Sequence, residues 1–135
     1  MSHLKDRVIM ITGAGSGFGA LLAEGSLARG AKVVALDLSK AAMARRLGEQ
    51  PRLLLHEADV RRRSDLDDVV RSAIDTFGGV DILVNNAGTM PLAFYEDHAI
   101  ANEAWDRCID VNIKGVLNGI MAVYDTMISQ GRGHV

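Results

Sequence analysis

Eight residues near the start of the chain combine small side chains with a glycine spacing suited to binding phosphate. The segment 12–19 reads Thr-Gly-Ala-Gly-Ser-Gly-Phe-Gly and follows an apolar run at 8–11. When a buried strand enters a glycine-rich turn and then a helix, the backbone can approach a pyrophosphate closely and the first helical N–H groups face the anion. The pattern therefore predicts a phosphate-binding turn formed by Gly13, Ser16, Gly17, Phe18 and Gly19.

An acidic residue lies at the distance from this turn that a dinucleotide site requires. Asp37 ends a second apolar run, 32–36, and lies 24 positions after Gly13, where about 20 is usual for the acid that binds the adenosine ribose. Its carboxylate would accept both ribose hydroxyls and repel a 2′-phosphate, while Ser16 and Leu38 supply no cation for that phosphate. We therefore expect NAD in preference to NADP. The alternative is a strand-end acid that simply faces water.

Composition limits the classes of partner. The 135 residues, 48% of them apolar, suit a single domain with a real core, and the net charge of −2 gives no reason to expect nucleic acid. No apolar run is long enough for a membrane span. A single cysteine, Cys108, cannot form an internal disulfide, so we expect a reducing, cytoplasmic setting. The four histidines show no ligand spacing with Cys108, and no metal site is expected.

Apolar runs alternate with helical patterns along the chain. Strands are expected at 7–12, 32–37, 53–59 and 80–84, and their apolar runs are continuous, so both faces of the sheet must be covered. Helices are expected at 17–29, at 40–47, from an N-cap at Ser64 to 77, from about 99, and at 111–129. The sequence thus predicts an α/β fold, a Rossmann-type doubly wound parallel sheet with four strands and the start of a fifth near 131–135.

The segment 111–129 has apolar residues most of the way round the expected helix. Such a helix is buried on more than one side. We expect one side to pack on the sheet and the other to contact a second subunit in a homo-oligomer. Because the chain ends as the fifth strand begins, the last helix is expected to have no strand to return to, leaving one edge of a central strand unpaired.

Four motifs in order give the chain a family resemblance. It resembles the short-chain dehydrogenase/reductases from residue 7 to 135. The motifs are Thr12-Gly13-x-x-x-Gly17-x-Gly19, then Asp59-Val60, then Asn85-Asn86-Ala87-Gly88, and finally Trp105 followed by Val111-Asn112-Ile113-Lys114-Gly115.

The resemblance implies roles for individual residues. In the family the reaction is hydride transfer between a nicotinamide and an alcohol or carbonyl, which implies a small alcohol or ketone substrate here. Asp59 and Val60 correspond to the pair that contacts the adenine, and Asn112 corresponds to the catalytic asparagine, which holds a water in the proton relay. The remaining matched residues lie along the cofactor; they are Asn86, Ala87 and Gly88.

The chain departs from the family pattern at the residues that move the proton. No Tyr-x-x-x-Lys is present, because Tyr95 is followed four positions later by Ala99 and Tyr124 by Ile128. Asn112 alone represents the four catalytic positions. We therefore expect 1–135 to be one NAD(P)-binding domain that ends before the catalytic serine, tyrosine and lysine and is inactive alone. Two alternatives are a protein of this fold that binds nucleotide or another subunit without catalysis, and a methyltransferase, which the Asn-Asn-Ala-Gly motif disfavours.

Overall fold

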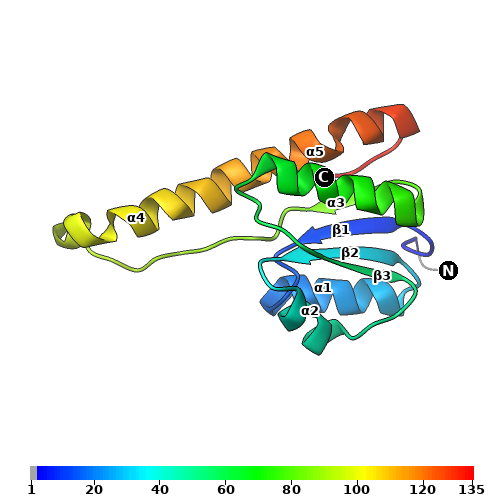
Figure 1. Ribbon diagram of the computed structural model, residues 1–135, viewed down its shortest axis with the longest axis horizontal. Helices are drawn as coiled ribbons and strands as arrows, with labels where there is room; N and C mark the ends of the chain where they lie inside the picture. Colours follow the sequence, from blue (N-terminus) through cyan, green and yellow to red (C-terminus); the bar gives the residue numbers. More distant parts are fainter. Residues whose placement is uncertain (1–2) are drawn as a thin grey trace.

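Four apolar runs form the four parallel strands of one sheet in the computed structural model, which describes residues 3–135 (Figure 1). The strands are β1 (Val8–Thr12), β2 (Lys32–Asp37), β3 (Leu53–Glu57) and β4 (Ile82–Val84). Their order across the sheet is β3-β2-β1-β4, and every pairing is parallel. The chain therefore reverses its direction of travel across the sheet at β1, as the doubly wound prediction requires.

Helices cover both faces of the sheet, which confirms the expectation drawn from the continuous apolar strands. On one face α1 (Gly17–Ala28) and α2 (Lys40–Leu47) pack over Ile9 and Ile11. On the other, α3 (Arg63–Phe77) and α5 (Gly115–Gln130) pack over Met10, and Figure 1 shows the two pairs of helices on opposite sides of the strands. Successive side chains of β1 alternate between the two cores because side chains in a strand point to opposite faces.

The N-terminus of α3 differs from the prediction. Its N-cap is Arg62, with an extended backbone and no side-chain capping bond, and Ser64 lies inside the first turn. The first-turn carboxylate of Asp65 instead accepts a hydrogen bond from the backbone N–H of Asp59 at 2.9 Å. The helix starts earlier than predicted because the Arg62 carbonyl accepts its first backbone bonds, from the N–H groups of Asp65 at 3.2 Å and Leu66 at 3.5 Å.

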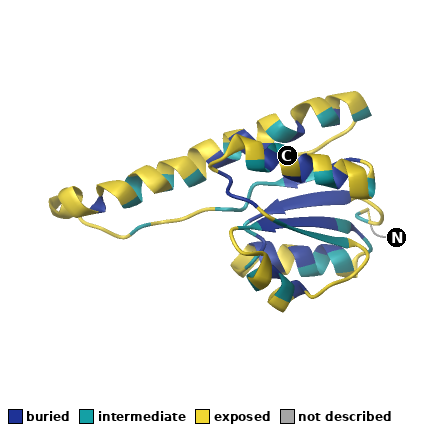
Figure 2. Ribbon diagram, in the orientation of Figure 1, coloured by how far each residue is buried: buried dark blue, intermediate teal, exposed yellow. Residues whose placement is uncertain are grey.

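The two helices expected after residue 98 form one continuous rod. A short 3₁₀ turn (Tyr95–Asp97) leads into α4 (His98–Ile109), and a π-helical turn, η2 (Asp110–Lys114), joins α4 to α5 without a break. No proline or glycine lies between 98 and 114 to stop the helix. Figures 1 and 2 show α4 extending beyond the sheet, with most of its surface exposed, and Ala101 is the one buried residue that it contributes.

One side of α5 is buried and the other is open. The buried residues of α5 are Gly115, Asn118, Gly119, Val123 and Met127. The opposite side presents a continuous apolar stripe whose exposed members are Leu117, Ile120, Met121, Tyr124 and Ile128. The prediction that one side packs inward is confirmed, and the stripe is the side for which a second subunit was expected.

The end of the chain returns to the sheet. His134 forms a parallel bridge with Ile82, in which Leu83 N–H donates to the His134 carbonyl at 2.9 Å and His134 N–H donates to the Asp81 carbonyl at 3.0 Å. The expected start of a fifth strand is therefore present. The expectation that the last helix has no strand to return to was wrong at this position, because the turn after Gln130 is tight enough to bring His134 beside β4.

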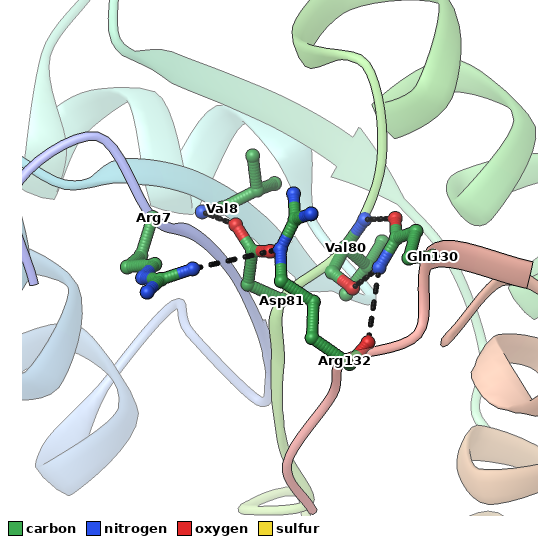
Figure 3. A network of polar contacts seen from close by, with 6 residues as sticks. All are labelled: Arg7, Val8, Val80, Asp81, Gln130 and Arg132. Atoms are coloured by element: carbon green, nitrogen blue, oxygen red, sulfur yellow. Dashed lines mark hydrogen bonds and ion pairs between the residues drawn. The ribbon is translucent and has the colours of Figure 1, made fainter. Parts of the chain in front are cut away.

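A buried carboxylate fastens this turn to the sheet. Asp81, 8% exposed, accepts the Val8 N–H at 2.9 Å and the Arg132 Nε–H at 2.7 Å, with Arg7 Nη1 3.9 Å away (Figure 3). Beside it the Gln130 side chain donates to the Val80 carbonyl at 2.9 Å and accepts the Val80 N–H at 3.1 Å. Strand β4 starts only at Ile82, because the backbone of Val80 pairs with this side chain rather than with a strand.

We predict that Asp81→Asn lowers the free energy of unfolding by about 1–3 kcal/mol at pH 7, because it weakens buried hydrogen bonds to Val8 and Arg132. Burial raises the pKa of Asp81, but the Val8 amide and Arg132 outweigh it and hold that pKa below its usual value. A lowered folded-state pKa gives stability that is present above the unfolded value of about 3.9 and is lost as pH falls through the folded one.

Urea unfolding between pH 7 and 3 measures both effects. The wild type should lose stability more steeply than Asp81→Asn at the acid end. Asp75→Asn is the matched control, since Asp75 is exposed on α3 and has no ion pair within residues 3–135; it should follow the wild type. Identical acid limbs for wild type and Asp81→Asn would contradict the assignment.

Candidate functional site

A cleft of about 440 Å³ lies where the carboxyl ends of the strands meet the loops that follow them, a volume typical of small-molecule sites. It includes the point between β1 and β4 at which the strand order reverses, where doubly wound sheets bind ligands. Most of the predicted site residues line it, namely Gly13, Ser16, Gly17, Phe18, Asp37, Leu38, Asp59, Val60, Asn86, Ala87 and Gly88.

The glycine turn places the start of α1 at the wall of this cleft. Gly13 and Gly17 have φ of +67° and +53°, in the left-handed region that favours glycine. Ser16 is the N-cap and makes no side-chain capping bond, and the first turn of α1 holds no acidic residue. A helix leaves its first N–H groups without an intrahelical partner and carries partial positive charge there. The turn therefore presents donors to an anion.

Gly19 lies behind the turn and does not line the cleft. A Cβ atom built on Gly19 would collide with the Gly13 carbonyl oxygen and would lie 2.5 Å from the Asn86 amide nitrogen. Its role is to let α1 approach the turn and the loop after β4 closely, so the structure separates it from the residues that could touch a ligand.

Strand β1 and the loop after β4 are joined by reciprocal hydrogen bonds. Thr12 Oγ1 accepts the backbone N–H groups of Asn86 at 3.0 Å and Ala87 at 2.9 Å. The Asn86 side-chain amide donates to the carbonyls of Thr12 at 3.0 Å and Gly13 at 3.2 Å. Asn86 therefore fixes the turn from behind, while Ala87 and Gly88 form the neighbouring wall.

The Asp37 carboxylate stands at the end of β2 and faces the glycine turn. Its Oδ2 accepts the Gly15 N–H at 2.8 Å and its Oδ1 accepts the Leu38 N–H at 2.7 Å. A carboxylate can accept about four hydrogen bonds, so each oxygen keeps capacity for a ligand hydroxyl. A Cβ on Gly15 would lie 2.8 Å from Oδ2, and glycine at 15 is what lets this carboxylate approach the turn.

The second acidic residue of the cleft has a different environment. Asp59 is 7% exposed, and the Arg61 guanidinium contacts it through Nε, 3.0 Å from both carboxylate oxygens, and Nη2, 2.6 Å from Oδ2. These bonds from Arg61 hold the pKa of Asp59 below its usual value, against the opposing effect of burial. Arg61 lines the cleft because its guanidinium turns back onto Asp59.

The loop that carries Asp59 is anchored to α5. Asn118, 4% exposed, donates its side-chain amide to the Val60 carbonyl at 2.8 Å. A Cβ on Gly115 would lie 2.7 Å from Val60 Cγ2, so the helix can approach Val60 only because residue 115 is glycine. Sequence reasoning missed Asn118, since a single amide within an apolar helical pattern gives no spacing signal.

Asn112 lies in η2, outside the cleft wall. Its Oδ1 accepts the Thr89 N–H and its Nδ2 donates to the Thr89 carbonyl, both at 2.8 Å. The amide thus pairs with both backbone groups of Thr89, as a neighbouring strand would. Thr89, Arg107 and Val111 line the cleft, and sequence reasoning missed them because only the fold brings α4 and η2 back to the loop after β4.

Two further properties bear on the chemistry available. Within residues 3–135, no three His, Cys, Asp or Glu side chains gather where they could hold a metal ion. No helix in this part of the chain has the length and apolar character needed to cross a bilayer. The first N–H groups of α1 and the carboxylate of Asp37 are among the polar groups that line the cleft, together with Asp59, Arg61 and Arg107.

Comparison with known proteins agrees with this geometry. Residues 7–135 match the family described as short chain dehydrogenase. An uncharacterized oxidoreductase of Staphylococcus aureus is 36% identical over 137 aligned positions, and one of Staphylococcus saprophyticus is equally similar. The crystal structure of a short-chain dehydrogenase/reductase, glucose/ribitol dehydrogenase, from Brucella melitensis is 29% identical and superposes on 91% of this chain with a TM-score of 0.83.

The chain spans only part of these proteins. It covers 58% of the Staphylococcus aureus protein, 55% of the Staphylococcus saprophyticus protein and 53% of the Brucella melitensis chain. A short-chain dehydrogenase from Streptomyces avermitilis is 27% identical with a TM-score of 0.84, and there the match covers 94% of this chain and 46% of the other.

We predict that Gly19→Ala destabilises the protein by about 1–3 kcal/mol, because the added methyl group has no room between the Gly13 carbonyl and the Asn86 amide. Gly25→Ala is the control in the same helix, since a Cβ there would meet only Arg29 Nη1 at 3.3 Å; it should stabilise by roughly 0.5–1 kcal/mol. Chemical unfolding of the two variants compares them directly. Equal stabilities would show that α1 does not depend on this close approach.

Proposed function

Because the chain belongs to the short-chain dehydrogenase family, whose match covers residues 7–135, we propose that its cleft binds NAD for hydride transfer to or from an alcohol or carbonyl substrate. The observation that carries the proposal is the pairing of an uncapped helix N-terminus at Ser16 with a carboxylate at Asp37 in one cleft. The first suits a diphosphate and the second suits a ribose.

The residues of the cleft fit such a cofactor group by group. The first amides of α1, behind Gly13 and Ser16, would hold the diphosphate, and Asp37 the adenosine ribose. Leu38, Asp59 and Val60 would surround the base, while Ala87 and Gly88 would lie along the nicotinamide side. When bound, the cofactor supplies a ring that donates or accepts hydride. The protein supplies binding and orientation.

The preference for NAD over NADP rests on charge. Asp37 already accepts two backbone N–H groups, so its carboxylate is held facing the site where a 2′-phosphate would lie. The negative charges of the Asp37 carboxylate and of a 2′-phosphate would repel each other in a partly buried cleft. The flanking cleft residues Ser16 and Leu38 carry no charge that would offset the repulsion.

The reaction needs groups that the 135 residues do not contain. The family's acid/base is a tyrosine whose pKa a lysine lowers, and no Tyr-x-x-x-Lys is present. The function that we propose for these residues is therefore the cofactor-binding part of the catalyst. Nucleotide binding without catalysis is the second candidate. The two differ in whether the coding sequence continues past residue 135 into a serine and a Tyr-x-x-x-Lys, and sequencing the gene beyond that codon separates them.

We further propose that the protein is a homo-oligomer joined through α5. On the apolar stripe of α5, Tyr124 is 58% exposed and Ile128 is 65% exposed. A contiguous exposed apolar surface of this kind is typical of a site that a partner covers. Leu117 lies on the same stripe. A second copy of the chain would present an identical stripe, as a twofold interface requires.

We also propose a reducing, cytoplasmic setting for the protein, on the basis of its single cysteine.

We predict that the wild type binds NAD at least about tenfold more tightly than NADP. Asp37→Ala should lower NAD affinity about tenfold, because a ribose hydroxyl bonded to a carboxylate contributes about 1.5–3 kcal/mol. The same change should leave NADP affinity unchanged or raise it, because it removes the charge that repels the 2′-phosphate. Calorimetric titration measures all four affinities. Glu57→Gln is the matched control, since Glu57 is the register partner of Asp37 on β3 and lies outside the cleft. Tighter binding of NADP by the wild type would overturn the preference.

We predict that Leu117→Glu lowers the sedimentation mass of the protein, because it places a charge within the apolar stripe that forms the proposed interface. Ser129→Glu is the control on α5, since it adds the same charge at an exposed residue outside the stripe. Sedimentation velocity should give the oligomer for the control and a smaller species for Leu117→Glu. A wild-type monomer at micromolar concentration would refute the interface.

A further inference from the structure

We propose that Arg107 is a ligand-binding residue of the cleft, and that its guanidinium contacts the diphosphate of the dinucleotide from the side opposite the first amides of α1. This inference rests on the proposed dinucleotide function and adds to it a binding residue on α4. It predicts which part of the ligand loses affinity when the guanidinium is removed.

Four charged side chains line the cleft, and two of them pair with each other. Arg61 and Asp59 form an ion pair in which Nη2 lies 2.6 Å from Oδ2. Asp37 accepts two backbone N–H groups and has no cation partner within residues 3–135. The charges that remain are one carboxylate and the guanidinium of Arg107. A ligand that carries both hydroxyl groups and an anionic group complements the two.

The Arg107 guanidinium has no protein partner in the part of the chain that the structure describes. It makes no hydrogen bond or ion pair there, although Glu103 and Asp110 lie about one turn before and after it on the same helical rod. The Arg107 side chain is exposed. Its planar set of N–H donors, which matches the oxygens of a phosphate in pairs, is therefore available to a ligand.

The fold places Arg107 on the wall of the cleft that faces α1. Helix α1 packs on one face of the sheet and α5 on the other, and α4 continues from α5 through η2 past the ends of the strands (Figure 1). Val111 and Arg107 both line the cleft, because residues four positions apart share a helix face. A ligand that lies over the ends of the strands therefore has the first amides of α1 on one side and Arg107 on the other.

Close contacts through the loop after β4 keep these two walls near each other. The glycine turn touches the start of this loop, since a Cβ on Gly13 would lie 2.9 Å from Ala87 Cα. Two residues later the Thr89 carbonyl accepts the Cys108 thiol, with 3.3 Å between the oxygen and Sγ, and Cys108 is the neighbour of Arg107. Three loop residues extend over at most about 10 Å. One ligand group can therefore contact both walls.

Charge decides which group of the ligand Arg107 contacts. The diphosphate carries negative charge, whereas the riboses and the adenine are neutral. Hydrogen bonds from a guanidinium to a phosphate are shorter and roughly twice as strong as those between neutral groups. The positive end of α1 lies across the cleft, so the diphosphate would be held between two positive groups. Arg107 thus raises the affinity of any ligand that carries the diphosphate, whatever group is attached beyond it.

The test is calorimetric titration of the full chain with NAD, with ADP-ribose, which keeps the diphosphate but lacks the nicotinamide, and with adenosine, which has no phosphate. Arg107→Ala should weaken NAD and ADP-ribose alike by about tenfold, the ratio for one hydrogen bond to a charged group. It should leave adenosine affinity unchanged. Arg107→Lys, which keeps the charge but loses the planar fork of donors, should give intermediate affinities.

Arg45→Ala is the matched control, because Arg45 is an exposed arginine of α2 that lies outside the cleft and has no ion pair among the described residues. It should leave all three affinities unchanged. Raising the NaCl concentration from about 0.1 to about 1 M shortens the screening length from about 10 Å to about 3 Å. The wild type should therefore lose NAD affinity with salt more steeply than Arg107→Ala does.

The outcomes separate this inference from the proposed function. If Arg107→Ala binds NAD as tightly as the wild type, or loses adenosine affinity as much as NAD affinity, the assignment of Arg107 to the diphosphate is overturned and the proposed function stands. If the wild type binds neither NAD nor ADP-ribose, both are overturned. Arg107→Lys carries the same comparison if Arg107→Ala does not fold.

Discussion

The site depends on the close contact between the glycine turn and the loop after β4. Thr12 and Asn86 exchange hydrogen bonds from opposite sides, and Gly19 leaves the space in which these groups meet. Buried polar groups that lack partners cost free energy, so a contact that pairs all of them is strongly specified. This contact places the start of α1, the end of β1 and the loop after β4 around one cleft. The remaining site residues are arranged relative to it.

The two carboxylates of the cleft show how environment separates chemically identical groups. Asp37 accepts single bonds from two backbone amides, whereas Asp59 accepts three N–H groups of one arginine, the backbone N–H, Nε–H and Nη2–H of Arg61. Asp37 is therefore suited to contact a ligand directly, and Asp59 is suited to hold Arg61 in place. The difference arises from residue 61, two positions after Asp59, and not from the strands that lead to the two acids, since Asp37 ends β2 and Asp59 lies in the loop after β3.

The rod formed by α4, η2 and α5 links three parts of the molecule. Asn118 and Gly115 of α5 hold the loop at Val60, Asn112 of η2 holds Thr89, and the apolar stripe of α5 faces outward. A π-helical turn at such a junction is typical of functional sites, because it adds a residue and re-aims the side chains that follow it. The proposed subunit interface and the loop at Val60 are therefore joined by one continuous helical element.

The sequence by itself determined the local features of this protein. Continuous apolar runs predicted a sheet covered on both faces, the glycine spacing predicted the turn, and the position of Asp37 predicted an acid at the end of β2, since each depends on residues close together in the chain. The turn and strands were found where predicted, although the N-cap of α3 and the start of β4 were not.

Only the tertiary structure decided which distant groups meet. The capture of Asp59 by Arg61 depends on a side-chain rotamer, and the anchoring of Val60 by Asn118 and the return of His134 to β4 depend on how helices cross the sheet. None of these contacts leaves a spacing pattern in the sequence, because hydrogen bonding and close packing are properties of three-dimensional neighbours.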